Sequence, residues 1–370
     1  MTSRDDVVAS LNGVIDPELR RPIGELGMIG EIEIEPRRLA VEIKLTVAGC
    51  PAADKIEADV RAALSAAFES LSAEVRLSVM TASERQALKD RLLDGRAPRT
   101  NPFTADSLTR VYLIGSGKGG VGKSSLTANL AVALAAKGLR VGLIDADIFG
   151  FSIPGQLGIT DKPTRLDDMI LPPVAFGVKV ISIGMFLDEK KPVAWRGPML
   201  HRAVEQFLVD VYWGDLDFLL VDLPPGTGDV AISLGQLLPS AKTVVVTTPQ
   251  TAAADVAERS GSVGLQTGQK VFGVIENMSW LEQHDGSRLE IFGSGGGLAV
   301  AERLAKISGQ PVELLGQIPI SVALREGSDA GHPVVLDSPA DAAAEAILSV
   351  AEKFAEDRIG LSGRRLKLSV

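Results

Sequence analysis

The chain has 370 residues, of which 45% are hydrophobic, 23% charged and 4% aromatic, which is typical of a globular protein with two or three domains. The net charge of −9 argues against nucleic acid as the main partner, because phosphate backbones are bound by basic surfaces. No apolar stretch is long enough to cross a bilayer and no secretory signal is visible, so we expect a cytoplasmic protein with no membrane partner.

The first part of the chain, residues 1–85, predicts a small α+β domain. Hydrophobic spacing indicates the order helix, strand, strand, helix, strand, over residues 3–14, 31–35, 39–47, 53–71 and 74–80. A polar stretch with glycine and two prolines follows. We interpret residues 86–108 as a short helix that leads into a linker.

Residues 109–358 predict a doubly wound α/β domain with a mostly parallel sheet. Continuous apolar runs, many of them rich in β-branched residues, recur at 110–116, 140–147, 178–185, 217–223, 243–249, 271–277 and 313–319. Segments of helical length separate most of these runs, which is typical of a parallel sheet covered on both faces. Residues 359–370 form a short basic tail. Sheets of this type bind ligands at the carboxyl ends of their strands.

A glycine-rich loop follows the first of these strands and opens a helix. Within "GSGKGGVGKSS", Gly117, Gly122, Lys123 and Ser124 satisfy the G-x-x-x-x-G-K-[ST] pattern of a phosphate loop. Lys123 can bridge the terminal phosphates of ATP, and the Ser124 hydroxyl can hold Mg²⁺. The predicted phosphate-binding residues are Gly115, Ser116, Gly117, Lys118, Gly119, Gly120, Val121, Gly122, Lys123, Ser124 and Ser125. The alternative is a turn that only packs a helix on a strand.

Acidic residues end two further strands of the predicted sheet. We assign Asp147 to positioning the attacking water, Asp222 to Mg²⁺, and Asp145 to a supporting role beside the metal. Gly226, in "PPGTG", is a candidate sensor whose N–H contacts the γ-phosphate. For Asp145 and Asp147 the competing interpretation is turn formation or helix capping.

Asn277 follows a later strand, where an amide that both donates and accepts could contact the adenine edge. The competing interpretation is an Asx-turn at the end of that strand. We expect residues 276–297 to form a long loop beyond it.

The phosphate loop, with the additional Lys118, resembles that of the ParA, MinD and nitrogenase-iron-protein class of ATPases. That resemblance implies that Lys118 reaches the partner's nucleotide across a nucleotide-bridged homodimer. The series "GSGKGGVGKSS", "DADIFGFSIPGQLG", "LLVDLPPGTGD", "ENMS" and "IFGSGGG" further resembles the Mrp/ApbC family over residues 108–355. The segments "VIDPELRRPIGELGMI" and "LTVAGCPAADKIEADV" resemble the small iron–sulfur assembly domain often fused to it. The family implies an ATPase that carries iron–sulfur clusters and passes them to apoproteins.

One feature of that family is missing from this chain. Between "ENMS" and "IFG" the family carries a Cys-x-x-Cys pair, whereas this chain has Gln283, His284 and Asp285 at about that place. A histidine and a carboxylate suit a divalent metal better than an iron–sulfur cluster, whose usual ligand is thiolate. The competing interpretation of His284 is an exposed loop residue.

Cys50 is the single cysteine and therefore the one candidate thiolate ligand of a labile iron–sulfur cluster. It lies between a strand and a helix, where a helix N-terminus is expected to lower the thiol pKa. Two copies could meet in a homodimer, and Asp16 and Glu18 could lie nearby. The competing interpretation is a small, partly buried hydrophobic residue.

Two functions remain in competition. The first is an ATP- and Mg²⁺-dependent carrier or assembly factor that serves apoprotein clients of iron–sulfur assembly. The second is a metal-free, ATP-switched dimeric scaffold, in which residues 280–290 recognise a protein partner with Trp280 as an apolar anchor. A positioning ATPase of the ParA or MinD type is disfavoured, because no membrane-targeting amphipathic helix or basic face is visible.

Overall fold

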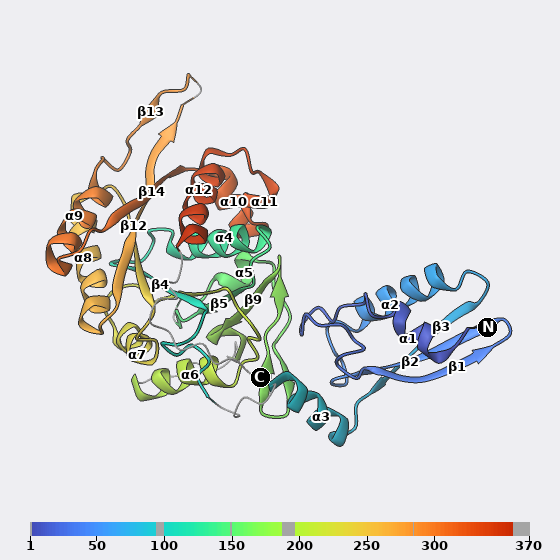
Figure 1. Ribbon diagram of the computed structural model, residues 1–370. Helices are drawn as coiled ribbons and strands as arrows, with labels where there is room; N and C mark the ends of the chain where they lie inside the picture. The colour runs from blue at the N-terminus through green and yellow to red at the C-terminus, as the bar shows by residue number, and fades with distance from the viewer. Residues whose placement is uncertain (1, 94–99, 149, 187–196, 284, 358–370) are drawn as a thin grey trace. The chain divides into compact units, whose positions relative to one another are not determined.

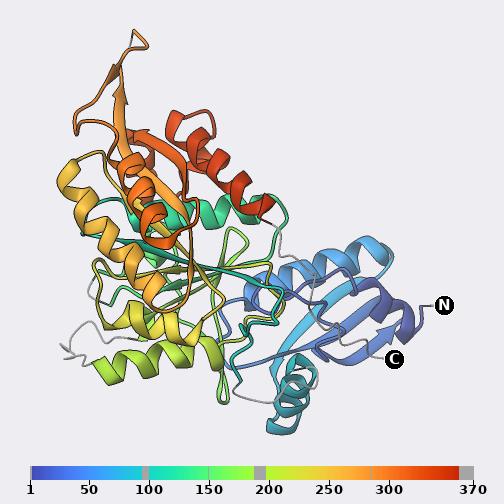
Figure 2. The same ribbon diagram turned by 60° about the vertical axis from the view of Figure 1, so that its left-hand side comes forward.

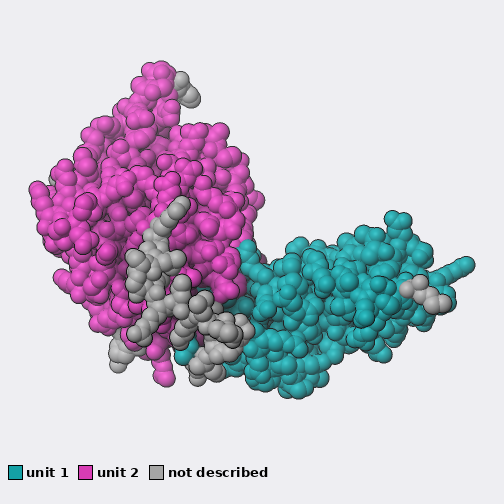
Figure 3. All heavy atoms as spheres, in the orientation of Figure 1, with its two compact units in different colours: residues 1–100, 161–174, 210–214 teal, residues 101–160, 175–209, 215–370 magenta. Residues whose placement is uncertain are grey.

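The computed structural model describes residues 2–93, 100–148, 150–186, 197–283 and 285–357. The chain folds into two compact units, which Figure 3 shows in different colours. Unit 1 contains residues 1–100 together with two later segments, 161–174 and 210–214. Unit 2 contains residues 101–160, 175–209 and 215–370. The predicted basic tail and His284 lie outside the described residues, as does part of the predicted linker.

Unit 1 is an α+β fold around a three-stranded sheet of order β1-β2-β3. Strands β1 and β2 are antiparallel, whereas β2 and β3 are parallel and joined by helix α2. The predicted order of elements is confirmed, the short helix predicted before the linker is α3 and belongs to unit 1, and a hairpin is added. The elements are α1 (Arg4–Ser10), β1 (Ile29–Glu35), β2 (Arg38–Leu45), α2 (Ala53–Ala67), β3 (Ser72–Val79), α3 (Ala82–Leu93), β6 (Thr164–Leu166) and β7 (Met169–Leu171).

Apolar spacing explains how helix α2 covers this sheet. Its buried residues Ile56, Val60 and Leu64 recur every four positions and so lie on one helical face. They pack in one core with the buried residues of β2, such as Val41. Hairpin β6–β7 contributes Leu166, Met169 and Leu171 to the same core, although it lies far along the chain. The sequence analysis did not predict this hairpin.

Unit 2 is built on a nine-stranded sheet of order β13-β12-β11-β4-β10-β5-β9-β8, with β14 also paired to β12 (Figure 1). The pairings among β4, β5, β9, β10, β11, β12 and β14 are parallel, and β12–β13 is antiparallel. The strands are β4 (Arg110–Ser116), β5 (Val141–Asp145), β8 (Val174–Ala175), β9 (Val178–Ser182), β10 (Phe218–Asp222), β11 (Lys242–Thr247), β12 (Lys270–Glu282), β13 (Arg288–Leu289) and β14 (Glu313–Ile320).

Helices cover both faces of this sheet. Val244 and Val246 of β11 pack in the core that contains α4 and α12, whereas the intervening Val245 packs in the core with α8 and α9. The doubly wound, mostly parallel fold predicted from the sequence is therefore confirmed. The helices are α4 (Lys123–Ala136), α5 (Ile153–Gln156), α6 (Gly197–Val209), α7 (Asp229–Leu237), α8 (Thr251–Gln266), α9 (Gly296–Ser308), α10 (Val322–Ala330), α11 (Val334–Asp337) and α12 (Ala342–Glu356), with a 3₁₀ turn at Ile183–Phe186.

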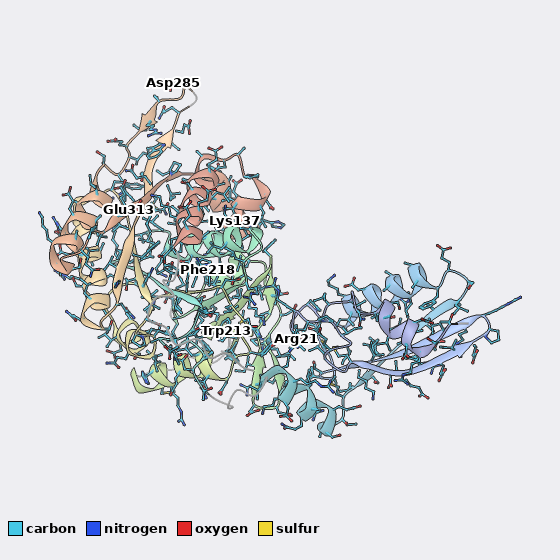
Figure 4. The ribbon with its side chains drawn as sticks, viewed as in Figure 1. Arg21, Lys137, Trp213, Phe218, Asp285 and Glu313 are labelled. Atoms are coloured by element: carbon cyan, nitrogen blue, oxygen red, sulfur yellow. The ribbon has the colours of Figure 1, made fainter. Side chains whose placement is uncertain are left out.

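The long loop expected at residues 276–297 is a wrong prediction. Strand β12 continues to Glu282 and returns through β13, so Leu281 pairs with Leu289 and Glu282 with Arg288. Figures 1 and 2 show this hairpin extending away from the rest of unit 2, and Figure 4 shows Asp285 at its tip. An aromatic residue such as Trp280 favours an extended strand, but the glycines at the end of the segment obscured that signal.

Candidate functional site

The phosphate loop joins the end of β4 to helix α4 and needs glycine at particular positions. Gly122 caps α4 with a φ of 79°, a left-handed conformation that side chains other than glycine rarely adopt. At Gly117 a Cβ atom would lie 2.3 Å from the backbone carbon of Val256 in α8. The loop is therefore pressed against α8. The backbone N–H groups at the start of α4, with the helix dipole, form the type of N-terminus that binds anions.

Asp222, at the end of β10, is the centre of the site. Its Oδ2 accepts hydrogen bonds from Lys123 Nζ at 2.7 Å and from Ser124 Oγ at 2.6 Å. Its Oδ1 accepts one from Thr127 Oγ1 at 2.9 Å. The side chains of Lys123 and Asp222 are 6% and 0% exposed. One lysine and two hydroxyls thus satisfy a carboxylate that would otherwise be costly to bury.

Ser124 and Asp222 are chemically suited to Mg²⁺, which binds hydroxyl and carboxylate oxygens. Among the residues that the structure describes, no three His, Cys, Asp or Glu side chains are grouped to hold a metal by themselves. Magnesium in nucleotide sites is usually held by one or two carboxylates plus substrate phosphates, so this small ligand set fits it.

Asp145 lies beside Asp222, since the two are paired across the parallel strands β5 and β10. Burial, together with the neighbouring charge of Asp222, raises the pKa of Asp145 to about 7. Its Oδ1 accepts the N–H of Asp147, and its Oδ2 accepts the N–H groups of Ser152 and Ile153 at 3.1 and 3.2 Å. Asp145 therefore organises the chain that leads into α5, as the turn-forming interpretation expects.

Asp147 is 9% exposed, and its Oδ1 accepts the backbone N–H of Gly150 at 3.1 Å. It thus lies in the same strand-end segment as Asp145. Gly226 has a φ of 89°, and its N–H donates to the carbonyl of Ser116 at 2.8 Å. Contact with a phosphate would require that bond to be exchanged.

Lys118 is held within its own chain by a residue that the sequence analysis did not identify. Its Nζ donates to Oε1 of Gln250 at 2.8 Å, immediately before α8 begins. Thr127 was missed as well, although its position one helical turn after Lys123 was a usable signal.

Asn277 lies within β12, is 4% exposed, and does not form the Asx-turn considered as its alternative. Its Nδ2 donates to the Val121 carbonyl at 2.9 Å. A Cβ on Gly122 would lie 2.2 Å from the same nitrogen. Asn277 therefore fixes the phosphate loop through the backbone of Val121.

The neighbouring Glu276 forms a buried network that the sequence analysis also missed. Its Oε1 accepts from Ser279 Oγ at 2.9 Å and Gln317 Nε2 at 2.7 Å, and its Oε2 accepts the Gly297 N–H at 2.6 Å. The carboxylate thus fixes the first residues of α9 to the sheet, where a helix N-terminus favours negative charge.

Trp280 does not project as a free anchor. The guanidinium carbon of Arg288 lies 4.0 Å from the centre of its ring, which indicates a cation–π contact within the hairpin. Gln283 and Asp285 belong to the exposed turn, where Asp285 accepts hydrogen bonds from Ser287.

The predicted low pKa of Cys50 is wrong. Burial, followed by the charge of Glu18, raises the pKa of the thiol to about 11. The Ala52 N–H at the start of α2 acts in the opposite direction but does not prevail. Cys50 is 6% exposed and its Sγ donates to Glu18 Oε2 at 3.8 Å. The predicted proximity of Asp16 and Glu18 to Cys50 is confirmed, since, besides burial, the charges of both carboxylates raise the pKa of its thiol.

Glu18 is buried and has a second partner from hairpin β6–β7. Thr164 Oγ1 donates to Glu18 Oε1 at 2.9 Å. Burial raises the pKa of Glu18, and the Thr164 hydroxyl opposes that rise. Within unit 1, Cys50, Glu18 and Thr164 thus form one connected set of polar contacts, and Cys50 also belongs to the apolar core of the unit.

Comparisons with known proteins match both halves of the chain. Residues 107–355 match the family described as NUBPL iron-transfer P-loop NTPase, and residues 4–76 match the iron-sulfur cluster assembly protein family. The iron-sulfur cluster carrier protein of Mycobacterium bovis is 54% identical, over 97% of this chain and 95% of that protein. That of Bacillus subtilis is 42% identical, over 86% of this chain and 88% of that protein.

A solved structure of a nucleotide-binding protein from Archaeoglobus fulgidus in complex with ADP is 35% identical, with a TM-score of 0.52. It covers 62% of this chain and 92% of its own. In the described part of the chain, no helix combines the length and the apolar character needed to span a membrane. The resemblance seen in the motifs is confirmed: the chain belongs to the iron–sulfur cluster carrier family of P-loop NTPases and carries an N-terminal iron–sulfur cluster assembly domain.

Proposed function

We propose that the chain is a Mg²⁺-dependent ATPase that carries iron–sulfur clusters to apoproteins and works as a nucleotide-bridged homodimer. The observation that carries the ATPase assignment is the buried Asp222, which gathers Lys123 and Ser124 at the mouth of the phosphate loop. When ATP–Mg²⁺ binds, Lys123 exchanges Asp222 for the terminal phosphates. Ser124 and Asp222 would then hold Mg²⁺, which would supply positive charge beside the phosphates.

Three further residues complete the proposed reaction. Asp147 positions the attacking water, and Asp145 orders the segment that carries it. Lys118 leaves Gln250 and reaches the nucleotide of the partner subunit, so hydrolysis requires two chains. Gly226 exchanges the Ser116 carbonyl for the γ-phosphate, and hydrolysis reverses that exchange.

The ATPase assignment is tested by phosphate release with single variants. Lys123→Ala and Lys118→Ala should each abolish hydrolysis. Asp147→Ala should slow hydrolysis while ATP still binds, because its role is confined to the attacking water. Full activity in Lys123→Ala would overturn the phosphate-loop assignment.

The cluster is the proposed cargo, and the relatives named as carriers support it. This chain has one thiol per subunit, so a bound cluster would take two Cys50 thiolates from a dimer and further ligands from outside. The buried position of Cys50 implies that the residues around it must move before the thiol can bind a cluster.

Anaerobic reconstitution, measured as iron and sulfide per chain, tests this part. The proposal expects uptake by the wild type and loss of uptake in Cys50→Ala. Equal uptake by the two proteins would show that Cys50 holds no cluster.

The second candidate is a metal-free scaffold whose binding to a protein partner is switched by ATP. The buried thiol with a raised pKa favours it, because such a thiol is a poor ligand in this conformation. Two results together would support this candidate over the carrier. A protein partner would bind in the presence of ATP without iron, and the wild type would take up no cluster.

A further inference from the structure

Hairpin β6–β7 is held in unit 1 by apolar packing, by ion pairs and by a buried hydrogen bond. Leu166 and Leu171 are fully buried in the core of the unit. Lys89 of α3 forms an ion pair with Asp168, and Arg85 forms another with Asp167 at 3.6 Å. At one end of the hairpin, Thr164 donates to the buried carboxylate of Glu18.

Backbone pairing adds a third strand-like segment to the hairpin. The N–H of Ile170 donates to the Asp210 carbonyl, and the N–H of Tyr212 donates to the Ile170 carbonyl, each at 2.8 Å. Residues 161–174 and 210–214 therefore enter unit 1 together, although the flanking chain belongs to unit 2.

The connections between this hairpin and unit 2 are short on both sides. Ile159 packs on the main core of unit 2, and the hairpin begins at Thr164. On the other side the hairpin ends at Leu171, and Ala175 packs on the same core of unit 2. The intervening residues 160–163 and 172–174 contain three prolines, which restrict the backbone. Each connection is therefore only three or four residues long and contains at least one proline.

The first connection leads directly back to the proposed nucleotide site. Asp145 accepts the N–H groups of Ser152 and Ile153 and so fixes the start of α5. Helix α5 ends at Gln156, and Gly158 then packs closely against Gly331. Asp145 neighbours Asp222, which contacts Lys123 and Ser124. A continuous series of contacts thus runs from the phosphate loop to α5, and the chain continues from there to the hairpin.

We propose that hairpin β6–β7 is a strap that couples the nucleotide site to the Glu18–Cys50 pair, with Thr164 as the positioning residue. Binding of ATP–Mg²⁺ rearranges Asp222 and the neighbouring Asp145 segment, which pulls on the strap through residues 157–163. The Thr164–Glu18 bond then loosens and Cys50 becomes accessible. The proposal rests on nucleotide binding at the phosphate loop. It adds the device by which that binding reaches the N-terminal domain.

The proposed coupling is reciprocal. A change in the accessibility of Cys50 caused by ATP requires that modification of Cys50 changes the affinity for ATP by the corresponding factor. Coupling between sites typically amounts to about fivefold or more. A role of the hairpin confined to stability predicts neither effect.

The test is alkylation of the full chain by iodoacetamide, followed by intact mass. Because Cys50 is the single cysteine, every alkylated thiol reports this position. We expect the rate with ATP–Mg²⁺ to exceed the rate without nucleotide by roughly fivefold or more. We expect Thr164→Val to raise the rate without nucleotide and to reduce the additional effect of ATP. Alkylated protein should show a changed affinity for ATP, measured with a fluorescent analogue.

Matched variants separate the strap from general destabilisation. Lys89→Ala removes an ion pair to the hairpin, whereas Lys55→Ala removes the Lys55–Asp59 pair elsewhere in unit 1. Thr104→Val, at an exposed threonine of unit 2, is the control for Thr164→Val. Only Lys89→Ala and Thr164→Val should raise the labelling rate, at temperatures where all four variants are folded.

Two results would overturn the proposal. The first is a labelling rate that ATP leaves unchanged while the fluorescent analogue shows normal binding. The second is a rate that neither Thr164→Val nor Lys89→Ala changes. If the chain bound no nucleotide, the proposed function and its coupling to the strap would both fail. The labelling rates of the variants measured without nucleotide would still decide whether the hairpin covers Cys50.

Discussion

The nucleotide site and the polar contacts among Cys50, Glu18 and Thr164 are both organised around a buried carboxylate. The two carboxylates differ in the hydrogen-bond donors that they face. Asp222 accepts bonds from a lysine and two hydroxyls, at distances of 2.6–2.9 Å. Glu18 accepts from the hydroxyl of Thr164 and the thiol of Cys50, and its carboxyl pKa is raised by burial. A neighbouring cation favours the charged form of a buried carboxylate, whereas burial without a cation raises the carboxyl pKa.

The difference explains what each site can do without rearrangement. Asp222, with Ser124 beside it, presents oxygens of the type that Mg²⁺ binds. The thiol of Cys50 stays protonated, and the negative charge of Glu18 is one of the causes. The nucleotide site therefore already presents suitable metal ligands. At Cys50, the surrounding residues must move before the thiol can act as a ligand. The predictions below test this contrast.

The largest effect is expected from Lys123→Ala. Removing the lysine leaves Asp222 buried without its cation, which should lower the free energy of unfolding by about 3–5 kcal/mol. Urea unfolding measures it, with Lys137→Ala at an exposed lysine as the control. The double variant Lys123→Ala/Asp222→Asn should recover much of that stability. A single variant as stable as the wild type would show that the pair is not the centre of the site.

A large kinetic effect is expected at Cys50. A pKa raised from 9.0 to about 11 lowers the thiolate fraction by roughly 100-fold at neutral pH. Iodoacetamide, in the absence of nucleotide, should therefore modify the folded chain at least about 100 times more slowly than the chain unfolded in urea. Equal rates would mean that the thiol is neither buried nor perturbed.

Asn277→Ala should have a moderate effect and distinguish two roles. Loss of its bond to the Val121 carbonyl costs about 1 kcal/mol, so ATP should bind roughly fivefold more weakly. If Asn277 supports the loop alone, ATP and GTP lose the same factor. If it also reads adenine, ATP loses more than GTP. Asn12→Ala, at an exposed asparagine, should change neither affinity.

The smallest effect concerns pH and Glu18. Its pKa is higher in the folded than in the unfolded chain, where 4.5 is the ordinary value. Its contribution to stability is therefore fully present below about pH 4.5 and is lost as pH rises through the folded pKa. Glu18→Gln avoids that loss. Urea unfolding should therefore show that the free energy of unfolding of the variant rises relative to that of the wild type between pH 4 and pH 7. A difference that does not change with pH would contradict the raised pKa; the exposed Glu69→Gln is the control.

The sequence predicted the sheet and the phosphate loop because their signals are local. Apolar runs identify strands such as β4 and β10, and the glycine and lysine spacing identifies the loop that follows. The strand-end position of Asp222 was visible as well, since parallel strands place their carboxyl ends at one edge.

The remaining features depend on contacts between distant segments, which one sequence does not display. Thr164 meets Glu18 across 146 positions of the chain, and Lys118 meets Gln250 across 132. The thiol pKa of Cys50 was mispredicted because the helix N-terminus was visible in the sequence, whereas the burial and the nearby Glu18 charge that outweigh it were not. The hairpin beyond Asn277 was missed because its turn residues resemble those of a loop.

The most direct test of the account is Mg²⁺-dependent release of phosphate from ATP by the full chain, followed over a range of protein concentrations. The Lys123→Ala/Asp222→Asn variant, which should fold but lacks both groups, gives the background. The account predicts release above that background, dependent on Mg²⁺, with a specific rate that rises with protein concentration as dimers form. Release that is equal in the two proteins, or independent of Mg²⁺, would contradict it.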